Sequence, residues 1–423
     1  MKLIKLIASF ILVIVLYIYL HNPIMANGIG SCKLLYIFGI LFVVAKASRF
    51  TRYISLFKTE FYLLLVLIVY SVFEFMRSGE PNTMRLHVVG LMEYFVLPFF
   101  LINYIKFIGE GEKGSFIKIL LIVGSIGAII TTACVTSPSF NEYVRLTFNK
   151  AVLASTDEFR ANTMYRGFGI SEGLTYSYGI IQGMFFVFFL FYIKQGKWVL
   201  PVSLLVILSA ALNARTGIVI AFAGVMVYFL YAKKNTSYFV VSLLLFIVIF
   251  NVGQLLQFLG LSSQTIDWLS MFVEEADSIF TNRSLTASGT TSYMFEEMLI
   301  LPSDFSEWLI GCGYDIYWST SRRSDLGWIV QLNFGGIIYM LLELYLLIYM
   351  YKRLKRKGFK SIALFFAIAF IIANTKGPVL PNSGIFRFIM LFYIYYIMYS
   401  NEMREYDIAS QNKHNKVLLK KSI

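Results

Sequence analysis

Three short segments of this sequence combine residues that could do chemistry on an anionic substrate. The first is residues 165–173 (YRGFGISEG), with Arg160 a few residues before it. Arg166 lies among glycines, next to a hydroxyl and to backbone N–H groups, and this combination suits the binding of phosphate. Glu172 is a candidate general base, although a solvated acid at the start of a helix is the more common role for such a residue.

The second segment is Ala214-Arg215-Thr216-Gly217, which joins two apolar runs with almost no loop between them. Arg215 is therefore expected at the outer membrane boundary, where a charge costs less than the roughly 3 kcal/mol of the helix centre. Gly217 allows a backbone or a ligand to approach closely. Two interpretations of Arg215 stay open. It is either an arginine that reaches the interface without a function, or a clamp for an anion that faces the protein interior.

The third segment runs through residues 311–318 (GCGYDIYW) and 322–328 (RRSDLGW). Asp325 lies just before an apolar run and beside Arg322 and Arg323. An acid in a cationic pocket is a candidate general base. The alternative for Asp325 is an N-cap of the following helix, and this alone would explain the residue.

Several further residues are candidates for binding or for pairing. Tyr317 and Trp318 are suited to stacking on sugar faces, although aromatic residues of the membrane interface are an equally good account. Arg387 follows a stretch rich in turn residues and could join the other arginines. Glu93 and Glu343 fall inside apolar runs, which makes each a functional or packing-pair candidate. No phosphate-binding loop, dinucleotide fingerprint or zinc-protease motif occurs, so we expect no cofactor and no metal.

The elements that must position these residues are hydrophobic. The chain has 423 residues, of which 58% are hydrophobic and 14% are charged, whereas soluble proteins carry about 25% charged residues. A spanning helix needs about 20 mostly apolar residues. We therefore predict an all-α polytopic integral membrane protein that forms a single transmembrane domain over residues 1–423, with about twelve transmembrane helices. The expected spans are 4–20, 33–48, 60–76, 86–108, 116–136, 174–193, 198–213, 216–232, 238–258, 328–351, 361–374 and 384–400.

The distribution of lysine and arginine predicts the orientation, with both termini and the tail 401–423 in the cytoplasm. Two long outer loops, 137–173 and 260–327, are then expected to contain short helices, and long ordered loops are usually functional. Lysine predominates inside and arginine outside, which favours an anionic ligand at the outer face; ion pairing with loop acids is the alternative. The formal charge of +13 is spread between the apolar runs, so we expect no nucleic-acid partner.

Taken together, these segments resemble the Wzy-type polysaccharide polymerases, which share a superfamily with the O-antigen ligases. The resemblance lies in their order, in the topology and in four local patterns. Ligase-like members carry His-Asn or His-Ser at the end of the second loop, where this chain has Ser324-Asp325, and this difference favours the polymerase branch. The four patterns are Arg166-Gly167, Ala214-Arg215-Thr216-Gly217, Gly311-Cys312-Gly313, and Ser324-Asp325-Leu326-Gly327 with Gly335-Gly336.

The resemblance implies a metal-independent glycosyltransferase of the bacterial cytoplasmic (inner) membrane, with its active site facing outward. Its donor and acceptor would be glycans linked to undecaprenyl diphosphate, which it would join into O-antigen or capsule. Arg215 and Arg166 would stabilise the leaving diphosphate, with Arg160 and Arg387 in support, while Asp325 would orient or deprotonate the acceptor hydroxyl. Membrane lipid and a co-polymerase that sets chain length are the further partners to expect. The alternatives are a lipid-linked oligosaccharide flippase or another transporter, and an O-antigen ligase.

Overall fold

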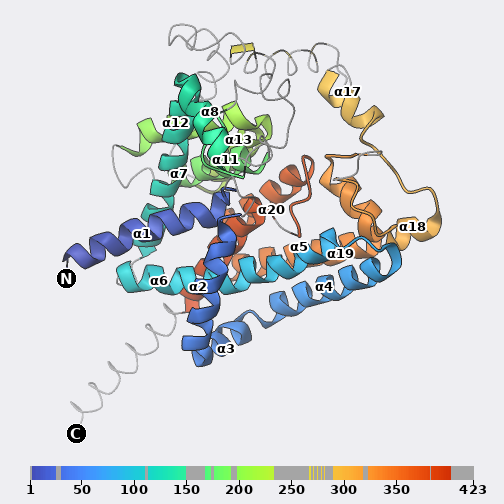
Figure 1. The fold of residues 1–423 in the computed structure, drawn as a ribbon, viewed down its shortest axis with the longest axis horizontal. Helices are drawn as coiled ribbons and strands as arrows, with labels where there is room; N and C mark the ends of the chain where they lie inside the picture. Colours follow the sequence, from blue (N-terminus) through green and yellow to red (C-terminus); the bar gives the residue numbers. More distant parts are fainter. Residues whose placement is uncertain are drawn as a thin grey trace.

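A computed structural model of the chain (Figure 1) is helical almost throughout the residues that it describes, with no β-strand among them. One isolated bridge joins Ile24 to Gly30. The described residues are 2–24, 30–109, 113–148, 167–172, 176–191, 198–232, 266–267, 270, 274, 278, 281, 289–317, 323–381 and 383–401.

Within these ranges, five helical segments are long and apolar enough to cross a membrane. A sixth is obtained if α2 (Cys32–Ala45) and α3 (Ala47–Leu56), which are bent by 100° against each other, are counted as one broken span. This identifies a membrane protein. The five segments are α1 (Lys2–His21), α4 (Lys58–Ser78), the continuous run of α5 (Asn82–Leu91), η1 (Met92–Val96) and α6 (Leu97–Gly109), α7 (Lys113–Thr136) and α19 (Gly327–Arg356).

Shorter helices complete the described part of the chain. Four of them are apolar and coincide with expected spans: α11 (Tyr176–Phe191), α12 (Val199–Asn213), α13 (Arg215–Ala232) and α20 (Lys360–Asn374). A last helix covers 384–401. The expected span 238–258 lies outside the described residues, so the total of twelve spans stays a prediction. The remaining helices are α8 (Pro138–Phe148), α17 (Gly289–Glu296) and α18 (Phe305–Ile310).

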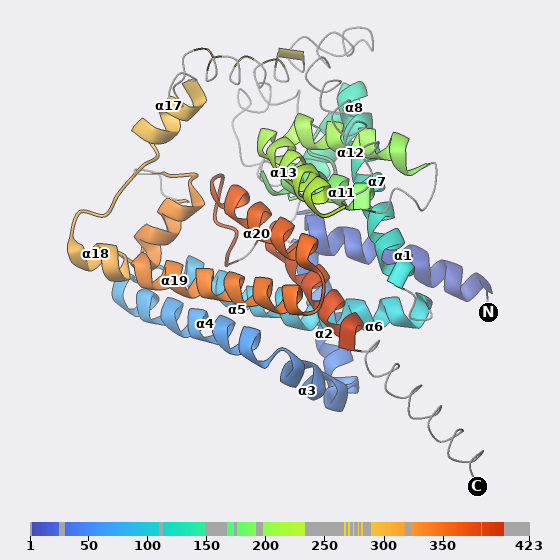
Figure 2. The same ribbon diagram turned by 180° about the vertical axis from the view of Figure 1, so that it is seen from behind.

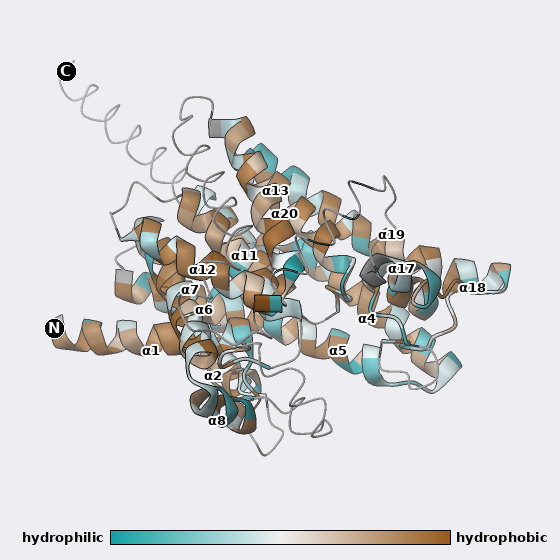
Figure 3. Cartoon of the chain, turned by 90° about the horizontal axis from the view of Figure 1, so that it is seen from above, coloured by the Kyte–Doolittle hydropathy of each residue, from teal (hydrophilic) through white to brown (hydrophobic). Residues whose placement is uncertain are grey.

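The outer surface of the bundle is apolar. Leu3, Phe10, Val69 and Met76 are each more than 60% exposed, with values of 67%, 66%, 68% and 80%, and α1 and α12 are mostly hydrophobic along their length (Figure 3). Exposure of such a surface to water is unfavourable, and monomeric soluble proteins rarely expose large contiguous apolar patches. Lipid tails remove this cost, so the pattern fits helices that face a membrane.

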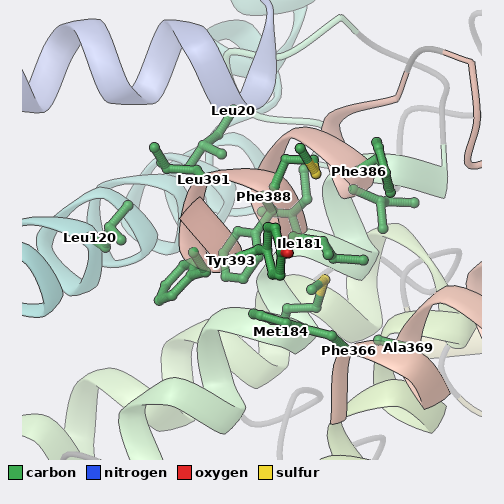
Figure 4. Close-up of a cluster of buried hydrophobic side chains, with 14 of the residues drawn as sticks. Leu20, Leu120, Ile181, Met184, Phe366, Ala369, Phe386, Phe388, Leu391 and Tyr393 are labelled. Atoms are coloured by element: carbon green, nitrogen blue, oxygen red, sulfur yellow. The ribbon is translucent and has the colours of Figure 1, made fainter. Parts of the chain in front are cut away.

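The helix 384–401 lies at the centre of the core. Nearly all of its residues from Ile385 to Ile397 are buried, on every side of the helix. A helix that is hydrophobic all round is expected inside a bundle. In Figure 4 the side chains of Phe386, Phe388 and Leu391 lie among those of surrounding helices. The labelled neighbours are Leu20 from α1, Leu120 from α7, Ile181 and Met184 from α11, and Phe366 and Ala369 from α20.

Glycines allow α11 and α13 to pack with their backbones in close contact (Figure 2). A Cβ added at Gly183 would lie 2.2 Å from the Gly217 carbonyl oxygen, and one added at Gly217 would lie 2.3 Å from that of Gly179. Gly179 and Gly183 are spaced as small residues are in closely packed membrane helices. Gly217 of the Ala214-Arg215-Thr216-Gly217 segment therefore serves a helix contact.

The helix α19 breaks at Gly336, where the backbone has φ +65° and ψ −166°. The break leaves the carbonyls of Asn333 and Phe334 without their helical donors. The N–H groups of Cys312 and Gly313 donate to these two oxygens at 2.7 and 2.9 Å. Irregular backbone inside a membrane protein is tolerated where protein groups satisfy it. The Gly311-Cys312-Gly313 and Gly335-Gly336 patterns thus form one docking contact between the end of the second predicted loop and α19.

We predict that Gly336→Ala lowers the stability of the protein strongly. The new Cβ would meet the backbone of Leu309 at 2.4 Å and would also force a side chain into a positive-φ conformation, which alone costs about 1–2 kcal/mol. The matched control is Gly358→Ala, because Gly358 has φ +90° and nothing within 4 Å of the added Cβ. The measurement is the thermal midpoint in detergent. Equal shifts for the two variants would contradict the docking contact.

Candidate functional site

The helix ends on one side of the bundle enclose a cavity of about 440 Å³. Its walls come from the segment that follows α1, the first turns of α5 and α11, the first half of α19, and three connecting segments. The lysine and arginine pattern predicts that these helix ends and connections face outward. The lining residues are Asn22, Ile24, Thr83, Leu86, Glu172, Tyr176, Ser177, Asp315, Tyr317, Val330, Gln331, Phe334, Tyr339, Pro378, Leu380, Pro381 and Ser383.

Glu172 provides one carboxyl group of the cavity wall. The Asn22 side-chain amide donates to its Oε2 at 3.2 Å, and the Arg387 guanidinium lies 3.9 Å from the same oxygen. The Glu172 backbone N–H donates to the His21 carbonyl, so the end of α1 fixes this residue. Burial raises the pKa of the Glu172 carboxyl, while Arg387 and Asn22 lower it in part. Glu172 therefore takes up a proton at a higher pH than an ordinary glutamate.

Arg387 lies beneath Glu172 and is 1% exposed. Its Nη1 is 3.3 Å from Oε2 of Glu93, which is also 1% exposed. The Tyr36 hydroxyl donates to the other Glu93 oxygen at 2.5 Å, and the Tyr19 hydroxyl donates to the Glu93 backbone carbonyl at 2.8 Å. Glu93 belongs to the π-helical turn η1, and such turns often occur at functional sites. Arg387 is thus held between two acids.

Asp315 provides the second carboxyl group of the cavity. The Thr83 hydroxyl donates to its Oδ2 at 3.3 Å, and the Tyr317 backbone N–H donates to its Oδ1 at 3.1 Å. Burial raises the pKa of Asp315. The described residues that line the cavity include these two acids and no lysine or arginine. A neutral ligand rich in hydroxyl groups fits such a lining better than an anion does, because carboxylates repel negative charge.

The structure places the predicted residues of the third segment in two different surroundings. Tyr317 lines the cavity, and the Arg323 guanidinium carbon lies 5.8 Å from its ring centroid. Asp325 does not belong to the cavity lining; it pairs with Arg323 at 3.3 Å, with side chains 38% and 60% exposed. The N-cap interpretation of Asp325 is wrong, because the N-cap residue of α19 is Leu326 and no side chain caps this helix.

Arg215 is the first residue of α13 and is half-buried. The preceding residue, Ala214, lies against Gly179, about one helical turn from Tyr176 in the cavity wall. Arg215 is therefore on the α11 side of the cavity. The other predicted binding residues lie outside the described part of the chain; they are Arg160, Arg166, Trp318 and Arg322.

Sequence reasoning did not single out Asn22, Thr83 or Asp315 as site residues. Asp315 lies in the quoted third segment, but only its burial and its two donors distinguish it from other loop acids. The expectation that Glu93 is a packing-pair candidate is confirmed by its ion pair with Arg387. Two opposite charges inside apolar runs were the signal for this pair.

Comparison of the chain with protein-family models, curated proteins and solved structures finds no match. The resemblance to polysaccharide polymerases therefore rests on the order of the segments, the predicted topology and the local patterns.

We predict that Arg387→Met destabilises the protein by about 3–5 kcal/mol, because it leaves the buried Glu93 and the partly buried Glu172 without their cation. The double variant Glu93→Gln/Arg387→Met should regain part of the loss. Thermal unfolding of the detergent-solubilised variants checks both. The matched control is Arg323→Gln, since the exposed Arg323–Asp325 pair contributes about 0–1 kcal/mol. A loss for Arg387→Met no larger than that of the control would argue against the buried pair.

Proposed function

We propose that this protein is a polysaccharide polymerase that joins lipid-diphosphate-linked glycan repeat units at the outer face of the cytoplasmic membrane. One observation carries the proposal. A single cavity brings Glu172, from the end of the first predicted outer loop, together with Asp315 and Tyr317 from the second. Two acids and an aromatic ring among apolar walls suit a sugar, which offers hydroxyl groups and apolar ring faces.

The two substrates would occupy different parts of the site. The acceptor sugar enters the cavity, where hydroxyl groups donate to Glu172 and Asp315. The donor's diphosphate lies on the α11 side, next to Arg215, with Arg166 and Arg160 from the preceding loop. Arginine suits this role because its planar fork binds phosphate oxygens with two hydrogen bonds. Arg387 takes a different role, since Glu93 and Glu172 already engage its guanidinium.

The reaction is a glycosyl transfer. The acceptor hydroxyl oxygen attacks the anomeric carbon of the donor, and the bond from that carbon to the diphosphate oxygen breaks. The electron pair of the broken bond leaves with the lipid diphosphate, whose charge the arginines stabilise. The hydroxyl proton passes to the Glu172 carboxylate, which therefore replaces Asp325 as the favoured general base. No step needs a metal or a cofactor, and a co-polymerase remains the partner expected to set chain length.

We predict that cells that lack this gene display a single glycan repeat unit where wild-type cells display a ladder of polymers. A plasmid copy of the wild type should restore the ladder, whereas Arg215→Ala and Glu172→Gln should not, because each removes a group that acts in the transfer. A gel of surface glycan gives the measurement, and membrane blots confirm insertion. Loss of all repeat units on deletion would instead indicate a flippase or a ligase.

Conservative replacements separate chemistry from stability. Arg215→Lys should rescue the polymer only in part, because lysine keeps the charge and lacks the fork. Arg52→Gln is the matched control, since Arg52 is an exposed arginine of α3, which contributes no residue to the cavity lining. It should leave the ladder intact. Full activity of Arg215→Ala would remove Arg215 from the diphosphate site.

We predict that acidification abolishes the activity at a higher pH than it would if the general base had the pKa of a solvent-exposed glutamate. The base must be ionised, and because burial raises the pKa of Glu172, its carboxylate is lost as the pH falls through that raised value. The initial rate of polymerisation of purified lipid-linked repeat units, measured against pH, checks this. The Asp325→Asn variant should lose its activity over the same acidic pH range as the wild type. If Asp325→Asn abolishes the activity, the general base is Asp325.

A further inference from the structure

The carboxyl group of Glu343 is buried in the middle of α19, about two turns beyond the break at Gly336. The residue is 2% exposed. Within the described part of the chain, neither of its carboxyl oxygens makes a hydrogen bond of ordinary geometry, and the Tyr339 hydroxyl is the side-chain group that interacts with it. An ionisable group in a membrane-spanning helix is costly and marks a functional site by default. The proposed glycosyl transfer makes no use of Glu343.

The other buried acids among the described residues are all paired with a cation. Each of the three has an arginine: Glu60 pairs with Arg353, Glu74 with Arg77 at 2.5 Å, and Glu93 with Arg387 at 3.3 Å. An isolated carboxylate in an apolar interior becomes neutral by binding a proton, because desolvation of its charge is too costly. Glu343 has no such cation among the described residues, so its neutral acid form is favoured.

A line of polar side chains connects Glu343 to the cavity. Tyr339 precedes it by one helical turn on the same face of α19, and Tyr339 also lines the cavity. The Tyr339 hydroxyl lies 2.7 Å from Nε2 of His87 on α5. A tyrosine hydroxyl both donates and accepts, so it can turn between the imidazole and the carboxyl group.

The remaining titratable groups near this line do not supply a positive partner. From α4, the Tyr70 ring lies 5.9 Å from that of Tyr339, and its hydroxyl donates to the Gly335 carbonyl at 2.7 Å. The charged residues Glu74 and Arg77 of α4 pair with each other. From η1, Tyr94 donates to the Pro381 carbonyl at 2.6 Å. On α5, Arg85 is exposed, so His87 is the buried basic group of these three elements that contacts Tyr339.

We propose that Glu343 is a protonated carboxylic acid that holds an exchangeable proton, and that Tyr339 and His87 connect it to the cavity. The ligand of this site is the proton. The site does not depend on the identity of the substrate in the cavity, so it holds whether the protein transfers glycans or moves them.

An apolar carbodiimide tests the protonation state, because it reacts with a protonated carboxyl in an apolar setting. The acid proton goes to a carbodiimide nitrogen and the carboxylate oxygen bonds to its central carbon, after which rearrangement gives a stable N-acylurea. Dicyclohexylcarbodiimide should modify Glu343 in the full-length protein in membranes, as read by peptide mass spectrometry. The arginine-paired Glu60 and Glu74 are internal controls that should stay unmodified. No label on Glu343, or equal label on all three, would overturn the proposal.

Infrared spectroscopy tests the connection to the cavity. The wild type should show a carbonyl band of a protonated carboxyl that Glu343→Gln removes and that shifts on transfer to D2O. Tyr339→Phe keeps Glu343 and should slow this shift about fivefold or more, since it removes one hydrogen-bonding hydroxyl from the line. An unchanged band in Glu343→Gln would refute the site. An unchanged exchange rate in Tyr339→Phe would refute the connection.

Discussion

The buried guanidinium of Arg387 is the constraint on which the rest of the described structure depends. It lies on the central helix 384–401, where nearly every other side chain is apolar. A charge so placed needs opposite charge nearby, because its hydration is lost. Its two partners come from elsewhere in the chain: Glu93 from η1 and Glu172 from the segment before α11. The pairing therefore sets where α5, α6 and the end of the first predicted loop meet the core, and it fixes one wall of the cavity.

The opposite wall depends on a break in a helix. Because α19 opens at Gly336, the carbonyls of Asn333 and Phe334 accept donors from Cys312 and Gly313. This contact brings the end of the second predicted loop onto the bundle and places Asp315 and Tyr317 over the cavity. The glycine patterns that resemble those of polysaccharide polymerases have here an architectural role. They allow backbone to approach backbone, and they leave the chemistry to the side chains that follow.

How much of this was predictable from the sequence follows from the range of each interaction. Within the described residues, helices lie on the predicted apolar runs, because in lipid a backbone must satisfy its own hydrogen bonds and an apolar run does so as a helix. Glu93 and Arg387 were recognisable as unusual charges, yet 294 residues separate them, and only packing decides that they pair. Asp315 and Asp325 lie in the same loop segment, and the sequence around each of them is compatible with a general base. Which of them reaches the cavity depends on the docking of that loop against α19, which no local pattern encodes.

The ion pairs of Arg387 also limit where an anion can bind. Enclosed with two carboxylates, its charge is already balanced, so a diphosphate brought next to it would have to displace a buried acid and leave that acid unpaired. An arginine serves a phosphate at lower cost where it is less deeply buried, as at the half-buried Arg215 at the start of α13. The acids then belong in the cavity, where they meet hydroxyl groups. The proposed transfer, from the diphosphate of the donor to a hydroxyl group of the acceptor sugar, favours this separation, because arginines and acids side by side would neutralise each other.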